Sequence, residues 1–135
     1  MKREIITIDE SGRLTILTND AGTIADVRMS ETEIGGLFGV ITPTVRAAIK
    51  AVYRSGVVKE YDAKEYIHYS NESGLEVYYL KMVVTLAFRI DSYGAAKLRE
   101  YILHTICTAG RKNIVNILFS YTLDREGNKG IRFFN

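Results

Sequence analysis

The sequence predicts an α+β fold, and three observations carry that prediction. Near the start and again in the middle, apolar and polar residues alternate around turn-forming runs, which is the period of β-hairpins. Between these regions, two short stretches with the apolar period of helices are separated by a glycine. Further stretches of helical period follow the second region. At 135 residues, 47% of them hydrophobic and 25% charged, the chain fits one globular domain, residues 1–135.

Composition excludes several classes of protein. No apolar run reaches the roughly 18 residues of a membrane-spanning helix, and the opening MKREIITIDE lacks the apolar core of a signal peptide. Cys107 is the only cysteine, so we expect no disulfide within the chain and a buried, inert thiol. The two histidines, His68 and His104, fall on different predicted elements. We therefore expect a cytoplasmic protein without membrane partner, metal or cofactor, and no catalytic constellation indicates an enzyme.

Residues 1–28 are predicted to form β-strands. In EIITIDESGRLTIL, Ile6 and Ile8 alternate with polar residues, DESGR supplies a turn, and Leu14 and Ile16 resume the alternation. The run NDAG marks a second turn, and TIADVRM is expected to be a short third strand. We expect these strands to contribute to a small sheet.

A first helix is predicted from Ser30 to Gly39. The run SETE fits a capping box, in which Ser30 accepts a hydrogen bond from the third helical amide and Glu33 reaches back to the Ser30 amide. Gly35 and Gly36 each weaken this helix by about 1 kcal/mol against alanine, so we expect a second helix to pack closely here. Gly39 suits the end of the helix because it adopts positive φ without strain. The predicted apolar face consists of Ile34, Leu37 and Phe38.

A second helix is predicted from Thr42 to Ser55. Thr42 is expected to be its N-cap and Pro43 its first helical residue, where the missing N–H is no loss. Gly56 is expected to end it. One side of this helix carries Val45, Ala48, Ile49 and Val52. The opposite side carries Arg46, Lys50 and Arg54, within a segment, residues 42–59, that contains no acidic residue although the net charge of the chain is only +2.

Two short helices with a glycine in the turn between them are typical of the helix-turn-helix. In that motif the apolar side docks the second helix, and its far side is free to enter the major groove of DNA. The basic run adds the expectation of an anionic partner. We therefore predict a DNA-binding module whose partner is double-stranded DNA. The predicted contact residues are Thr42, Thr44, Arg46, Ala47, Lys50 and Arg54.

Two alternatives stay open. The helices from 29 to 56 can form an ordinary helical hairpin whose basic face is simply solvated. The same fold can also serve as a protein-interaction module without DNA binding, in which case an exposed apolar face is expected in place of a positive one.

Residues 64–80 are predicted to form a β-hairpin around the turn SNESG, which makes the whole arrangement winged-helix-like. Residues 81–107 are predicted to be helices. LKMVVTLAFRI is expected to be a buried helix rather than a strand, and SYGAAKLREYILHTI a helix capped by Ser92. We expect Arg89 and Arg99 to brace a carboxylate rather than to contact phosphate.

Residues 113–135 are predicted to form a C-terminal hairpin or strand. Apolar residues alternate in NIVNILFSYT, and DREGNKG is expected to turn the chain back into IRFF. An edge strand in such a hairpin pairs readily with a copy of itself, and one recognition helix touches only a few base pairs. We therefore expect a homodimer built at least partly from this segment.

The stretch MSETEIGGLFGVITPTVRAAIKAVYRSGVVKE resembles the opening of the RhuM family of virulence-associated proteins, which pair an ELFGV-like first helix with a TV…I second helix. The resemblance covers roughly residues 29–106. It implies a helix-turn-helix module that acts as a regulator or accessory protein of a phage or other mobile element. The chain departs from the family at Ile41–Thr42, where the family tends to have Ser-Arg, so one arginine is absent. The most specific part of the resemblance is the order Tyr79–Leu80, Arg89, Ser92, Ala96 and Arg99.

Overall fold

The computed structural model describes residues 3–17 and 27–108. The chain divides into two compact units, residues 1–100 and 101–135, and the elements below belong to the first unit except for the part of the last helix beyond Glu100. The predicted hairpin or strand at 113–135 lies outside the described residues. The prediction of a single domain over residues 1–135 therefore stays a prediction.

The first two strands form an antiparallel pair, as predicted. Strand β1 (Ile5–Ile8) pairs with β2 (Leu14–Leu17), with Ile6 opposite Ile16. The turn between them is organised by Asp9, whose carboxylate accepts hydrogen bonds from the amides of Ser11 and Arg13, both at 2.9 Å. The hydroxyl of Ser11 is the first of several donors that lower the pKa of Asp9 below its ordinary value.

A second, three-stranded antiparallel sheet has the order β3-β5-β4. Strands β4 (Lys64–His68) and β5 (Gly74–Tyr79) form the predicted hairpin, with Tyr66 opposite Glu76. The third strand that we expected from residues 23–29 is present as β3, which spans only Arg28–Met29 among the described residues and pairs with the end of β5. Beside it, a single parallel bridge joins Glu4 to Val27 and so connects β1 to the start of β3.

The described residues contain four α-helices and a short 3-10 helix, which confirms a mixed α+β fold with two small antiparallel sheets. The segment beginning at Leu80 is a helix, as favoured, and Ser92 caps the last helix by accepting a hydrogen bond from the Ala95 amide at 3.2 Å. The helices are α1 (Glu31–Phe38), α2 (Thr42–Ser55), α3 (Leu80–Ala87) and α4 (Tyr93–Thr108), and the 3-10 helix η2 spans Glu60–Asp62.

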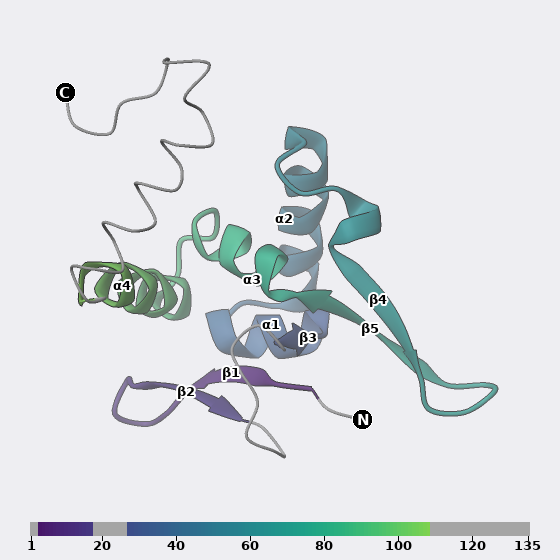
Figure 1. Cartoon of the computed structure of the whole chain (residues 1–135), viewed down its shortest axis with the longest axis horizontal. Coiled ribbons are helices and arrows are strands. Elements are labelled where there is room, and N and C mark those ends of the chain that lie inside the picture. The colour runs from purple at the N-terminus through teal and green to yellow at the C-terminus, as the bar shows by residue number, and fades with distance from the viewer. Residues whose placement is uncertain (1–2, 18–26, 109–135) are drawn as a thin grey trace, which may run out of the picture. The chain divides into compact units, whose positions relative to one another are not determined.

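The core of the first unit lies where α1 and α3 meet α2 and the three-stranded sheet. Figure 1 shows α1 lying crosswise near one end of α2, and the β4–β5 hairpin projecting away from both helices. The largest fully buried side chains include residues of all four α-helices and of β5, namely Phe38, Ile34, Val52, Val77, Met82 and Leu98. Because α1 is packed on several sides, it forms a fixed base for α2.

Helix α4 begins with an unusually close contact. A Cβ atom built on Gly94 would lie 2.0 Å from the carbonyl oxygen of Leu37, so only glycine allows the first turn of α4 to lie this close to the end of α1. Arg99 then donates hydrogen bonds to the carbonyls of Ala87 at 2.6 Å and Ile90 at 3.0 Å. It braces the end of α3, although through backbone carbonyls and not through the carboxylate that we expected.

The two halves of α4 differ in burial. Helical periodicity aligns Ala95, Leu98, Ile102 and Ile106 on one face. Ala95 and Leu98 are buried, but Ile106 is 57% exposed and Cys107 is exposed as well, so the expectation of a buried thiol is wrong. No helix in the described ranges has both the length and the apolar character needed to cross a membrane.

Candidate nucleic-acid interface

The capping box predicted at the start of α1 is present. The Glu33 amide donates to Ser30 Oγ at 3.2 Å, and the Ser30 amide donates to Glu33 Oε1 at 2.8 Å. Two backbone N–H groups that the helix leaves without internal partners are thereby satisfied. The direction in which the chain enters α1 is fixed by this pair.

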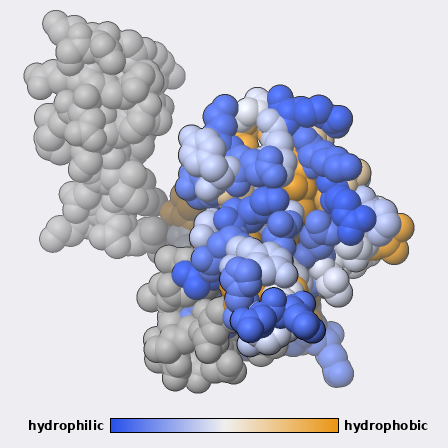
Figure 2. All heavy atoms as spheres, turned by 90° about the vertical axis from the view of Figure 1, so that its right-hand side faces the viewer, coloured by the Kyte–Doolittle hydropathy of each residue, from blue (hydrophilic) through white to orange (hydrophobic). Residues whose placement is uncertain are grey.

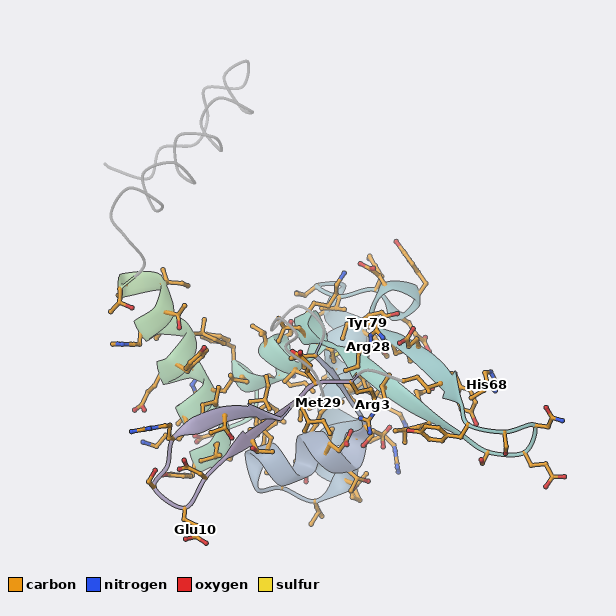
Figure 3. The ribbon with its side chains drawn as sticks, turned by 60° about the horizontal axis from the view of Figure 1, so that its bottom comes forward. Arg3, Glu10, Arg28, Met29, His68 and Tyr79 are labelled. Atoms are coloured by element: carbon orange, nitrogen blue, oxygen red, sulfur yellow. The ribbon has the colours of Figure 1, made fainter. Side chains whose placement is uncertain are left out.

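Arg3 extends the capping box across the fold. Its Nη1 donates to Glu33 Oε1 at 2.6 Å and to the Arg28 carbonyl at 3.2 Å, and Figure 3 shows Arg3 and Arg28 close together where β1 meets β3. Burial works to raise the pKa of Glu33, but the hydrogen bonds from Arg3 and the Ser30 amide outweigh it, so the pKa lies below its usual value. This pair leaves no signal in the sequence because its members are 30 residues apart.

The turn between α1 and α2 is built on two glycines. Gly39 has φ of 70°, in the left-handed region, and ends α1 as predicted. A Cβ atom on Gly35 would lie 2.8 Å from the Val40 carbonyl oxygen and 3.7 Å from Val45 Cγ2, whereas one on Gly36 would have no neighbour within 4 Å. The close approach that we expected at these two glycines is therefore present at Gly35 and not at Gly36, and its nearest atom belongs to the turn and not to the second helix.

Helix α2 begins one residue away from its predicted cap. Ile41 occupies the N-cap position in extended conformation and makes no side-chain hydrogen bond, and Thr42 is the first helical residue. The first backbone hydrogen bonds run from the amides of Thr44 and Val45 to the Ile41 carbonyl. The prediction of Thr42 as the cap is therefore wrong. Pro43 still falls in the first turn, where a backbone N–H has no partner within the helix, so the N–H that proline lacks is no loss.

The two sides of α2 divide as predicted. Val45, Ile49 and Val52 are buried against the rest of the fold, and Gly56, with φ of 78°, ends the helix. Ala48 is only partly buried. Of the predicted contact residues, Thr42 is partly buried and the others are exposed, namely Thr44, Arg46, Ala47, Lys50 and Arg54.

Arg46 differs from the other two bases because it is held by an acid of α1. Its Nε and Nη2 atoms both donate to Glu31 Oε2, at 3.2 and 2.9 Å. The Glu31 side chain is only 22% exposed, whereas that of Arg46 is 55% exposed. Glu31 stands in the first turn of α1, where the helix dipole favours a carboxylate. The pair therefore holds the guanidinium against the first turn of α1 without burying it.

Lys50 and Arg54 extend the basic surface along α2. Both are exposed, and within the described part of the chain neither takes part in an ion pair. We call Arg46, Lys50 and Arg54 the basic face of α2. Figure 2 views the molecule from the side on which the hairpin projects, and this side is largely hydrophilic with smaller hydrophobic areas.

The acidic residues that follow α2 are largely engaged with bases of their own. Lys64 Nζ lies 3.2 Å from Glu60 Oε1 and 3.2 Å from Glu76 Oε2. Lys81 forms an ion pair with Asp62. Burial works to lower the pKa of Lys64, but its hydrogen bonds to Glu60 and Glu76 outweigh it and the pKa is raised. These local pairs reduce the field that the acids exert on the basic face.

Two tyrosine hydroxyls, on α2 and on β5, lie in buried surroundings. Tyr78 Oη donates to Glu76 Oε1 at 3.0 Å, and burial together with this carboxylate raises the pKa of Tyr78 far above its ordinary value. The hydroxyl of Tyr53 is buried and has no hydrogen-bond partner among the described residues. Burial likewise raises the pKa of Tyr53, so both hydroxyls stay protonated at physiological pH.

The histidines and acidic side chains offer no metal site in the described ranges, since no group of three or more potential ligands gathers there. His68 lies exposed on the projecting hairpin (Figure 3), with its ring edge-on to Tyr66 at 4.7 Å between centroids. Both residues belong to β4, two positions apart, so His68 occupies a surface position on one strand of the hairpin.

Comparisons with known proteins return no match for this chain among protein-family models, curated proteins or solved structures.

Proposed function

We propose that the protein is a DNA-binding helix-turn-helix module whose α2 is the recognition helix. The observation that carries the proposal is the basic face of α2. Three cations stand on its exposed side, no acid lies between residues 42 and 59, and the opposite side of α2 is buried. Lys50 and Arg54 suit phosphates, which supply most of the affinity of such modules.

The arrangement around α2 also favours a winged-helix-like module. A short strand, β3, precedes α1, and it pairs with β5 of the hairpin that follows α2. A helix-turn-helix that shares one small sheet with the hairpin behind it is the general plan of winged helices. The hairpin tip carries Glu72 and no base, so we assign contact with phosphates to α2 and not to the wing.

The biological setting that we propose is a regulator or accessory protein of a mobile element. Its support is the resemblance of residues 29–106 to the RhuM family, which rests on the residues quoted above. Two of these have structural tasks here, since Ser92 caps α4 and Arg99 braces α3. That part of the resemblance therefore concerns the fold more than the contact surface.

The experiment that tests DNA binding is the triple variant Arg46→Ala, Lys50→Ala, Arg54→Ala. All three side chains are exposed, so we expect the variant to fold normally and to lose affinity for duplex DNA. Each phosphate contact removed should flatten the slope of log affinity against log salt concentration by about 0.9. Binding is measured by fluorescence anisotropy at several salt concentrations, and circular dichroism checks the fold.

A matched control carries three alanines at bases away from α2, namely Arg13, Arg89 and Lys97. The control has the same change in net charge, so it separates a local contact from a general electrostatic effect. An unchanged salt slope in the α2 variant, with its fold intact, would contradict the assignment of the basic face.

The second candidate function is a protein-interaction module of the same fold. It is favoured by Ile41 and Val57, which are 70% and 72% exposed at the two ends of α2. If this alternative holds, changing both residues to serine abolishes partner binding, whereas the alanine changes on the basic face do not. If the protein binds DNA instead, the alanine changes on the basic face weaken binding and the two serine changes do not.

A further inference from the structure

The basic face of α2 contains two kinds of cation, and the difference between them is the ion pair of Arg46 with Glu31. The guanidinium of Arg46 uses Nε and Nη2, one edge of its plane, to bind Glu31 Oε2 at 3.2 and 2.9 Å. Lys50 and Arg54 make no such pair in the described ranges. An anchored cation and two free ones are suited to different tasks.

The free edge of Arg46 has the geometry of a base reader. Nη1 and the outer hydrogen of Nη2 form the end of the guanidinium fork, and no hydrogen bond to this end is present among the described residues. Arginine recognises guanine by donating two parallel hydrogen bonds to O6 and N7 in the major groove. An arginine that is already oriented loses less conformational entropy when it makes this contact.

The anchor is itself fixed. Glu31 lies in the first turn of α1, its side chain is only 22% exposed, and the preceding residue, Ser30, is held by the capping box. Ala47 follows Arg46 on the exposed side of α2 and is too small to obstruct the approach of a base pair. The capping box thus fixes the start of α1, and Glu31 in turn fixes the orientation of the guanidinium.

We infer that Arg46 reads a guanine in the major groove and that Glu31 is the residue that positions it, while Lys50 and Arg54 contact phosphates. This inference rests on the proposed function and deepens it by naming the base that the site recognises. Glu31 acts through Arg46 and does not touch DNA.

The test begins with a duplex selected by the wild-type chain from a random library. Affinities are then measured for this duplex and for each single base-pair change in it. Arg46→Ala should abolish discrimination at one G·C pair, a loss of about 5- to 150-fold. Lys50→Ala should weaken binding to all sequences about equally and lower the salt slope by about 1.

Glu31→Ala is the decisive variant. It should reduce discrimination at the same G·C pair as Arg46→Ala, and the double variant should be no worse than Arg46→Ala alone, because the two residues act as one unit. Glu31→Gln keeps an acceptor and should lose less. It also serves as the second test if Glu31→Ala does not fold.

Glu65→Ala provides the matched control. It breaks a similar ion pair, between Glu65 and Arg28 at 3.2 Å in the three-stranded sheet, and changes the net charge by the same amount. Equal effects of Glu31→Ala and Glu65→Ala on every sequence would overturn the inference, since Glu31 would then act only through its charge. A wild-type chain that binds duplexes without base preference overturns the inference and leaves the proposed function intact. A chain that does not bind duplex DNA overturns both.

Discussion

At the scale of single residues, Glu33 does more than its place in a capping box requires. Its carboxylate accepts a hydrogen bond from the Ser30 amide and another from Arg3, whose guanidinium also reaches the carbonyl of Arg28. The pair of Arg3 and Glu33 therefore joins the residues before β1, β3 and the first turn of α1. The Glu33 side chain is 23% exposed, so water screens these contacts only in part.

The lowered pKa of Glu33 makes this junction sensitive to acid. A carboxyl group with a depressed folded-state pKa stabilises the fold above its unfolded pKa of about 4.3, and that stability is lost as pH falls through the folded-state value. We expect Glu33→Gln to lower the free energy of unfolding by about 0.5–1.5 kcal/mol at pH 7. The difference from wild type should be smaller at pH 3 than at pH 7.

Urea unfolding of wild type and variant at the two pH values measures this difference. Glu10→Gln, in the exposed turn between β1 and β2 (Figure 3), is the control and should change stability little at either pH. A constant difference between wild type and Glu33→Gln across the pH range would show that the charge of Glu33 is not what stabilises the junction.

At the scale of elements, the connection between α1 and α2 depends on one glycine and not on its neighbour. Gly35→Ala should destabilise the protein by about 1–3 kcal/mol, because the new Cβ would meet the Val40 carbonyl oxygen at 2.8 Å and the backbone of the turn must shift. Gly36→Ala has open space and should stabilise α1 by up to about 1 kcal/mol through helix propensity. Denaturant melts of the two variants measure the contrast. If both substitutions behave alike, the turn does not approach α1 at Gly35.

At the scale of the whole molecule, we propose a homodimer that involves residues 113–135. These residues lie outside the described part, but exposed apolar side chains of α4 precede them, including Leu103 at 54% and Ile106 at 57%. Sedimentation equilibrium should show a dimer for the full chain at tens of micromolar, the range of about 10⁻⁵ M that weak specific interfaces reach. A chain that ends at Arg111 should be monomeric. A dimer that survives this truncation would place the interface elsewhere.

Most of the local structure of this protein could be predicted from the sequence alone, although the N-cap of α2 is Ile41 and not Thr42. The capping box at Ser30, the end of α1 at Gly39, the end of α2 at Gly56 and the hairpin around SNESG depend on residues within one or two turns of each other. Such features follow from backbone angles and short-range hydrogen bonds, which a sequence pattern records directly. The basic face of α2 followed from spacing in the same way.

Contacts between distant residues were decided only by the tertiary structure. The pairing of Arg46 with Glu31, the reach of Arg3 to Glu33 and the passage of Gly94 beside the Leu37 carbonyl each join residues on different elements. No periodicity encodes which side chains meet when elements pack, because packing depends on the whole set of neighbours at once. For the same reason periodicity aligns Ile106 with Ala95 and Leu98, but only the folded chain shows that these two are buried and that Ile106 is exposed.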